Sequence, residues 1–76
     1  MAKAGRILSM YDRLVEGEVL TKKEEMERFN VGARTIQRDL DDIRAYLAES
    51  KRPGRELVFS KKKMGYEMRK TRQVDI

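Results

Sequence analysis

Two short segments of the chain concentrate side chains that donate hydrogen bonds or carry positive charge. The first contains Arg34, Thr35, Gln37 and Arg38, and the second is the run Lys61, Lys62 and Lys63. The guanidinium of arginine can donate two parallel hydrogen bonds to a guanine edge or a phosphate. The amide of glutamine can hydrogen-bond to adenine through both its oxygen and its nitrogen. Lysine neutralises phosphates without reading sequence. These residue types in these segments therefore indicate recognition of a polyanion.

The amino acids that are missing exclude several other kinds of chemistry. The chain has no cysteine and no histidine, which excludes disulfides, zinc fingers and nucleophile–base pairs built on either residue. No paired-carboxylate or metal-ligand cluster is visible, so we expect neither an enzyme nor a cofactor. No apolar run approaches the ~20 residues of a membrane span, and the N-terminus lacks a signal-peptide stretch. We therefore expect a cytoplasmic protein.

Positive charge is concentrated in the C-terminal third of the chain. The sequence has 76 residues, of which 41% are charged and 39% hydrophobic, and this mixture predicts one small globular domain. Residues 1–50 contain nine basic and ten acidic side chains, a balance of −1, whereas residues 51–76 contain nine and three, a balance of +6. The net charge of +5 therefore comes from the C-terminal third of the chain, and this distribution indicates a C-terminal appendage that binds an anion.

Apolar residues at helical spacing predict two helices in the first thirty residues. The first runs from Arg6 to about Glu16 and carries one apolar stripe, formed by Ile7, Leu8, Tyr11, Leu14 and Val15. Val19-Leu20 could be a short strand. A capping box of Thr21 and Glu24 begins the second helix, which runs to about Phe29.

A third helix is expected after a break at Asn30-Val31-Gly32, from about Ala33 to Glu49. Its inward residues are Ile36, Leu40, Ile43 and Leu47. On the helical wheel Arg34, Gln37 and Arg38 lie opposite this apolar arc. Positive charge in the first turns of a helix opposes its macrodipole. A local preference broken in this way points to function.

The last part of the chain predicts a basic β-hairpin after a loop at residues 50–54. The strands are Glu56–Ser60 and Tyr66–Arg69, joined by the five-residue loop 61–65. An isolated hairpin is marginal in water, so we expect it to pack on the helices through Leu57, Phe59, Tyr66 and Met68. Residues 71–76 are expected to be a tail or the start of a linker.

The order of these elements is that of a winged helix-turn-helix, mainly α-helical with a small wing of two to three strands. The segment Phe29-Asn30-Val31-Gly32-Ala33-Arg34-Thr35-Ile36-Gln37-Arg38-Asp39-Leu40 resembles the VSxRTIxRDI stretch of DeoR-type and WYL-domain bacterial transcriptional regulators. Gly65-Tyr66-Glu67-Met68 resembles the GGYRL that closes their wing. The resemblance covers roughly Arg6 to Arg69. Two positions depart from the family pattern: Gly32 stands where serine is usual, and Met64 replaces the first wing glycine.

The resemblance implies a sequence-specific domain for double-stranded DNA over residues 1–70, with its third helix in the major groove. It also implies a separate C-terminal effector or dimerisation domain, through which a homodimer could form, and association with the nucleoid. By itself the domain is expected to bind duplex DNA weakly, as a monomer. The residues expected at the DNA are Thr21, Ala33, Arg34, Thr35, Gln37, Arg38, Lys61, Lys62, Lys63 and Tyr66.

Plainer interpretations remain open for the charged residues. Arg38 could pair with Asp42 along the helix, and the three lysines could form a solvated hairpin tip. Asp39, beside the apolar arc, is expected to be a structural ion-pair or orienting partner for an arginine rather than a catalytic acid. Glu24, Glu25 and Glu27 are expected to be an ordinary charge run on a capped helix face turned away from DNA.

Two further interpretations concern apolar side chains. Tyr11 and Tyr46 are expected at the rim of the core. The alternative function is a winged-helix module that binds a protein, and such a module should expose an apolar patch of several hundred Å².

Overall fold

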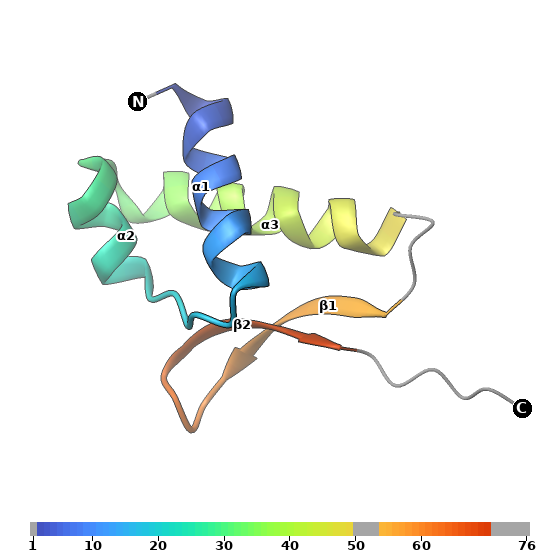
Figure 1. The fold of residues 1–76 in the computed structure, drawn as a ribbon. Coiled ribbons are helices and arrows are strands. Elements are labelled where there is room, and N and C mark those ends of the chain that lie inside the picture. The colour runs from blue at the N-terminus through green and yellow to red at the C-terminus, as the bar shows by residue number, and fades with distance from the viewer. Residues whose placement is uncertain (1, 50–53, 71–76) are drawn as a thin grey trace, which may run out of the picture.

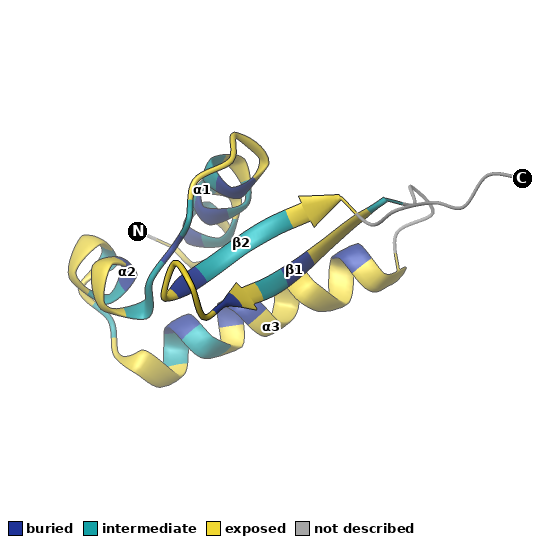
Figure 2. Ribbon diagram, turned by 90° about the horizontal axis from the view of Figure 1, so that it is seen from below, coloured by how far each residue is buried: buried dark blue, intermediate teal, exposed yellow. Residues whose placement is uncertain are grey.

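The computed structural model describes residues 2–49 and 54–70. Three helices, α1 (Lys3–Val15), α2 (Lys22–Phe29) and α3 (Ala33–Glu49), are followed by an antiparallel hairpin of β1 (Arg55–Ser60) and β2 (Gly65–Lys70). α1 crosses α3, α2 lies beside the first turns of α3, and the hairpin packs along α3 (Figures 1 and 2). This order and packing are those of a winged helix and confirm the predicted fold class. The expected tail at 71–76 and most of the expected loop lie outside the described residues.

One core lies between the three helices and the hairpin. Its buried side chains are Met10, Leu14, Leu20, Ile36, Leu40, Ile43, Leu47 and Leu57. All four inward positions predicted for α3 are buried, because an unbroken 3.6-residue period can present only one face to the core.

The prediction for α1 is wrong in two respects. The helix begins at Lys3 rather than Arg6, and its apolar residues do not form a single buried stripe. Met10 and Leu14 point into the core, whereas Leu8 and Val15 are exposed. Only part of the predicted stripe is buried, because a helix that crosses its neighbour can bury only a narrow arc of its surface. Arg6 occupies part of that arc.

The hairpin pairs Leu57 with Met68 and Phe59 with Tyr66. Leu57 is buried, and Tyr66 and Met68 pack against the core, as expected. Phe59 was expected there too, but its side chain is 48% exposed. Its ring meets the edge of the Tyr66 ring at a centroid distance of 5.1 Å, so Tyr66 makes the contact with the core in its place.

The possible strand at Val19-Leu20 is a single bridge to β2. The Leu20 amide donates to the Tyr66 carbonyl at 2.8 Å, and the Tyr66 amide donates to the Leu20 carbonyl at 2.7 Å. A Cβ added at Gly65 would lie 2.6 Å from Cγ1 of Val19 and 2.9 Å from the Leu20 carbonyl oxygen. Glycine at this position is therefore what allows the wing to dock against the segment that leads into α2.

Candidate nucleic-acid interface

Local hydrogen bonds define the turn between α2 and α3. The Thr21 hydroxyl accepts from the Glu24 amide at 3.1 Å, which confirms the expected cap at the start of α2. Asn30 ends that helix in the left-handed conformation, with φ 55°. The Gly32 carbonyl then accepts from the Ile36 amide at 3.2 Å. The two helices are thus joined by a short turn, as a helix-turn-helix requires.

The outer face of α3 presents the two arginines singled out by the sequence. Arg34 and Arg38 are exposed, with Ala33 exposed before them and Thr35 half-buried. Among residues 2–49 and 54–70, neither arginine has an acidic partner. Asp42, the possible partner of Arg38, pairs instead with Nζ of Lys3 at 3.4 Å.

Gln37 is turned towards the wing rather than fully outward. It is half-buried, and its Nε2 donates to Oδ1 of Asp41 at 2.9 Å. The Tyr66 hydroxyl lies 3.5 Å from its Oε1. To pair with a base edge through both ends of its amide, Gln37 would have to leave these neighbours.

The three wing lysines differ in their surroundings. Lys61 and Lys62 are exposed in the loop between the strands, whereas Nζ of Lys63 pairs with Oε1 of Glu67 at 3.0 Å. Glu67 also accepts from Arg69 at 2.9 Å. The hydrogen bonds from Lys63 and Arg69 lower the pKa of the Glu67 carboxyl. Lys61 and Lys62 are therefore the two wing lysines best placed to meet phosphates.

Met64 closes the wing turn in the left-handed region. Its φ is 58°, which is strained for a residue with a side chain. The turn is held in part by the Lys63 amide, which donates to the Ser60 hydroxyl at 3.2 Å.

An open hollow of about 400 Å³ separates the wing from the start of α2. It is lined by Thr21, Lys22, Phe59, Met64, Gly65 and Tyr66. The fold thus brings Thr21 and Tyr66 to one hollow, and Tyr66 also reaches Gln37 on α3. The sequence did not indicate Lys22, Phe59 or Met64 as neighbours of this site.

A buried ion pair joins α1 to α3. Both Nε and Nη2 of Arg6 donate to the Asp39 carboxylate, the latter at 3.2 Å. Asp39 is only 1% exposed, and its hydrogen bond raises the pKa of Arg6. The expected ion pair between Asp39 and an arginine is confirmed.

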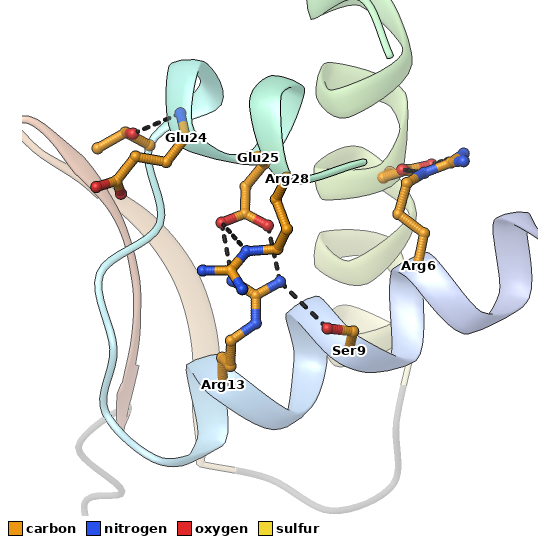
Figure 3. Close-up of polar contacts among 8 residues, drawn as sticks. Arg6, Ser9, Arg13, Glu24, Glu25 and Arg28 are labelled. Atoms are coloured by element: carbon orange, nitrogen blue, oxygen red, sulfur yellow. Dashed lines mark hydrogen bonds and ion pairs between the residues drawn. The ribbon is translucent and has the colours of Figure 1, made fainter. Parts of the chain in front are cut away.

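A second ion pair joins α1 to α2 (Figure 3). Arg13 donates to the two Glu25 oxygens at 2.8 and 2.7 Å, and this hydrogen bonding raises the pKa of Arg13. Glu25 is 1% exposed, so the expectation of an ordinary charge run is wrong at this position. The carboxylate can be buried because the guanidinium binds both of its oxygens.

The sequence carried a signal for these ion pairs that periodicity alone does not show. Arg6 and Arg13 are seven residues apart and lie on the same side of the helix as Met10, on the face that should be apolar. Charged residues inside an apolar arc need buried partners of opposite sign. Glu25 and Asp39, each directly before an apolar residue of its helix, are those partners.

No family model, curated protein or solved structure matches this chain in the three comparisons with known proteins. Over residues 2–49 and 54–70, no group of acidic side chains is arranged to hold a metal ion. None of the helices described is both long enough and apolar enough to cross a membrane.

Proposed function

We propose that this domain binds double-stranded DNA in a sequence-specific manner, as the N-terminal part of a transcriptional regulator. The observation that carries the proposal is the exposure of Arg34 and Arg38 on the second helix of a helix-turn-helix. Both lie near its N-terminal end, one turn apart, and face away from the core. Base-reading residues of docked helices occupy this part of the helix.

In the proposed complex, α3 lies in the major groove and the wing lies over the neighbouring backbone. Arg34 and Arg38 reach base edges and flanking phosphates. Lys61 and Lys62 neutralise phosphates from the wing loop. Thr21, at the start of α2, and Tyr66, at the base of the wing, face the hollow between the wing and α2.

The resemblance to DeoR-type and WYL-domain regulators supports the same proposal. The Arg-Thr-Ile-x-Arg-Asp-Leu string at 34–40 begins in the first turn of α3, which is the helix that these proteins insert into DNA. On this proposal the protein acts at the nucleoid, inside the cytoplasm. A C-terminal domain beyond residue 70 would supply the effector response and stable dimerisation.

Selection of bound sites from a random duplex library tests the proposal directly. We expect enrichment of a short motif, and tighter binding to that motif than to a scrambled duplex of equal length and composition. Affinity for both duplexes should fall as salt rises, because phosphate contacts release counterions. Failure to enrich any motif, with equal binding to both duplexes, would contradict sequence-specific binding.

One observation favours a second candidate, a module that binds a protein. Leu8 and Tyr46 are large, apolar and exposed beside an apolar hollow between α1 and α3. None of the residues around this hollow belongs to the expected DNA set. The two candidates therefore use different surfaces, and a protein surface on α1 does not exclude DNA binding by α3.

A further inference from the structure

Two of the large apolar side chains that the domain exposes belong to the wing. Among residues 2–49 and 54–70, the exposed large apolar side chains are Leu8, Val15, Tyr46, Phe59 and Met64. Tyr46 was expected at the rim of the core but is exposed on α3. Phe59 and Met64 are 48% and 70% exposed, and both line the hollow of about 400 Å³ between the wing and α2. We call this hollow the wing hollow.

Met64 keeps an apolar side chain at a position where glycine would be free of strain. Its φ of 58° lies in the left-handed region, which is costly for a residue with a Cβ atom. Asn30 has a similar φ of 55° at the end of α2, but asparagine adopts this conformation far more readily. Strained residues that persist in a fold are concentrated at sites that bind ligands. The Met64 side chain is therefore a candidate for contact with a ligand.

Positive charge lies around the wing hollow. Lys22 lines it and has no acidic partner among the described residues. Lys61 and Lys62 are exposed in the loop that leads to Met64. None of the described residues that line the hollow is acidic, although Glu24 is exposed further along α2. An apolar lining beside cationic side chains fits a ligand that is apolar on one side and anionic on the other.

We propose that the wing hollow holds one sugar–phosphate unit of the DNA backbone, an inference that rests on the proposed function. Phe59 and Met64 pack against the C–H groups of a deoxyribose, and Lys22 pairs with the adjoining phosphate. The Thr21 hydroxyl accepts from the Glu24 amide, so its own hydrogen can be donated to the same phosphate. Every nucleotide of a duplex offers this combination of an apolar sugar face and a negative charge.

Three physical properties follow from this assignment. The volume of the wing hollow, about 400 Å³, lies in the ~300–1,000 Å³ range of pockets that hold a small organic group. The deoxyribose is the same at every nucleotide, so its contact with Met64 contributes equally to the binding of every DNA sequence. The deoxyribose is also uncharged, so this contact releases no counterion and does not change the salt dependence of binding.

Met64→Gly removes the side chain and keeps the turn, because glycine adopts a positive φ without strain. We expect affinity to fall about three- to tenfold, the effect of burying part of one methionine side chain. The loss should be equal on the selected and scrambled duplexes, and the slope of log affinity against log salt should not change. Lys22→Gln should instead lower that slope by about one unit. Fluorescence anisotropy at several salt concentrations measures both variants.

The matched control is Leu8→Ala, which removes an equally exposed apolar side chain from α1, outside the wing hollow. It should bind both duplexes like the original chain. Thermal melts by circular dichroism should show Met64→Gly to be as stable as the original chain. Hydroxyl-radical cleavage of the bound duplex reports on the sugars directly, because the radicals attack each deoxyribose that the protein leaves accessible. Met64→Gly should expose sugars that the original chain protects, while protection of the selected motif remains.

Unchanged affinity of Met64→Gly for both duplexes overturns the proposal. A loss confined to the selected duplex overturns it too, because Met64 would then read a base. If a motif is selected and Met64→Gly binds normally, this inference fails while sequence-specific binding stands. If no motif is selected but Met64→Gly weakens binding to every duplex, the backbone contact stands and sequence specificity fails.

Discussion

Two pairs of arginines occupy opposite environments in this small domain. Arg6 and Arg13 on α1 are largely enclosed, and each binds a carboxylate that is almost fully buried. Arg34 and Arg38 on α3 are exposed and have no acidic partner among the described residues. The same side chain therefore fastens helices in one place and is available to a ligand in the other. What differs is whether a carboxylate from another helix reaches it.

The comparison also explains how α3 is held. Arg6 joins α1 to α3, and Arg13 joins α1 to α2. Both helices of the helix-turn-helix are therefore fixed to α1. A helix that presents side chains to base edges must be held rigidly. The buried arginines thus position the helix that carries the exposed ones.

The largest expected effect is on stability, when Asp39 is changed to Ala. Arg6 would then be buried without a partner, and we expect a loss of about 3–5 kcal/mol in the free energy of unfolding. Urea or thermal unfolding by circular dichroism measures it. The control Asp42→Ala removes an exposed ion pair between the same two helices, α1 and α3, and should cost about 0.5 kcal/mol or less. Equal effects of the two changes would contradict a structural role for the buried pair.

A smaller effect is expected on DNA affinity, when Arg38 is changed to Ala. On the best selected duplex we expect a loss of about 1–3 kcal/mol, with weaker preference at one or two base positions. The free energy of unfolding should change little, because the Arg38 side chain is exposed and has no acidic partner among the described residues. Fluorescence anisotropy on specific and scrambled duplexes measures the difference. Equal losses on both duplexes would show that Arg38 contacts only the backbone.

Lys62→Ala should weaken binding to every duplex by a similar and modest amount. In the proposed complex this lysine neutralises a phosphate, so the slope of log affinity against log salt should fall by about one unit. The matched change Lys63→Ala should lower the slope less, because Lys63 is already paired with Glu67. If neither change alters the salt slope, the wing lysines do not contact the DNA phosphates.

The smallest effect concerns pH and the exposed ion pairs of the wing. Lys63 and Arg69 lower the pKa of Glu67 relative to the unfolded chain. These ion pairs therefore stabilise the folded chain at pH values above the pKa that Glu67 has in the unfolded chain. This stabilisation is lost as the pH falls through the pKa that Glu67 has in the folded chain. Carboxyl chemical shifts measure the midpoint, which should rise when Lys63 and Arg69 are both changed to Ala. A midpoint that stays in place would show that solvent already screens these pairs.

Much of the fold could be predicted because local signals agreed with one another. The inward face of α3 and the Thr21 cap each depend on neighbours within a few residues. The exposure of Arg34 and Arg38 follows from the same helical period. The contact between Gln37 and Tyr66 was not predictable, because these residues lie on two elements that meet only in the folded chain. The pairing of Lys63 with Glu67 likewise requires the hairpin to be closed.

The order of the elements, the inner face of α3 and the position of the basic loop follow from the amino-acid sequence alone. Periodicity and turn chemistry are local, so residue spacing is enough to predict them. Which charges are buried and which apolar residues are exposed depends on the tertiary structure. Glu25 is enclosed and Leu8 is exposed, although a helical wheel suggests the reverse. The reason is that burial depends on where a neighbouring helix crosses, and that crossing is fixed by contacts between residues far apart in the chain.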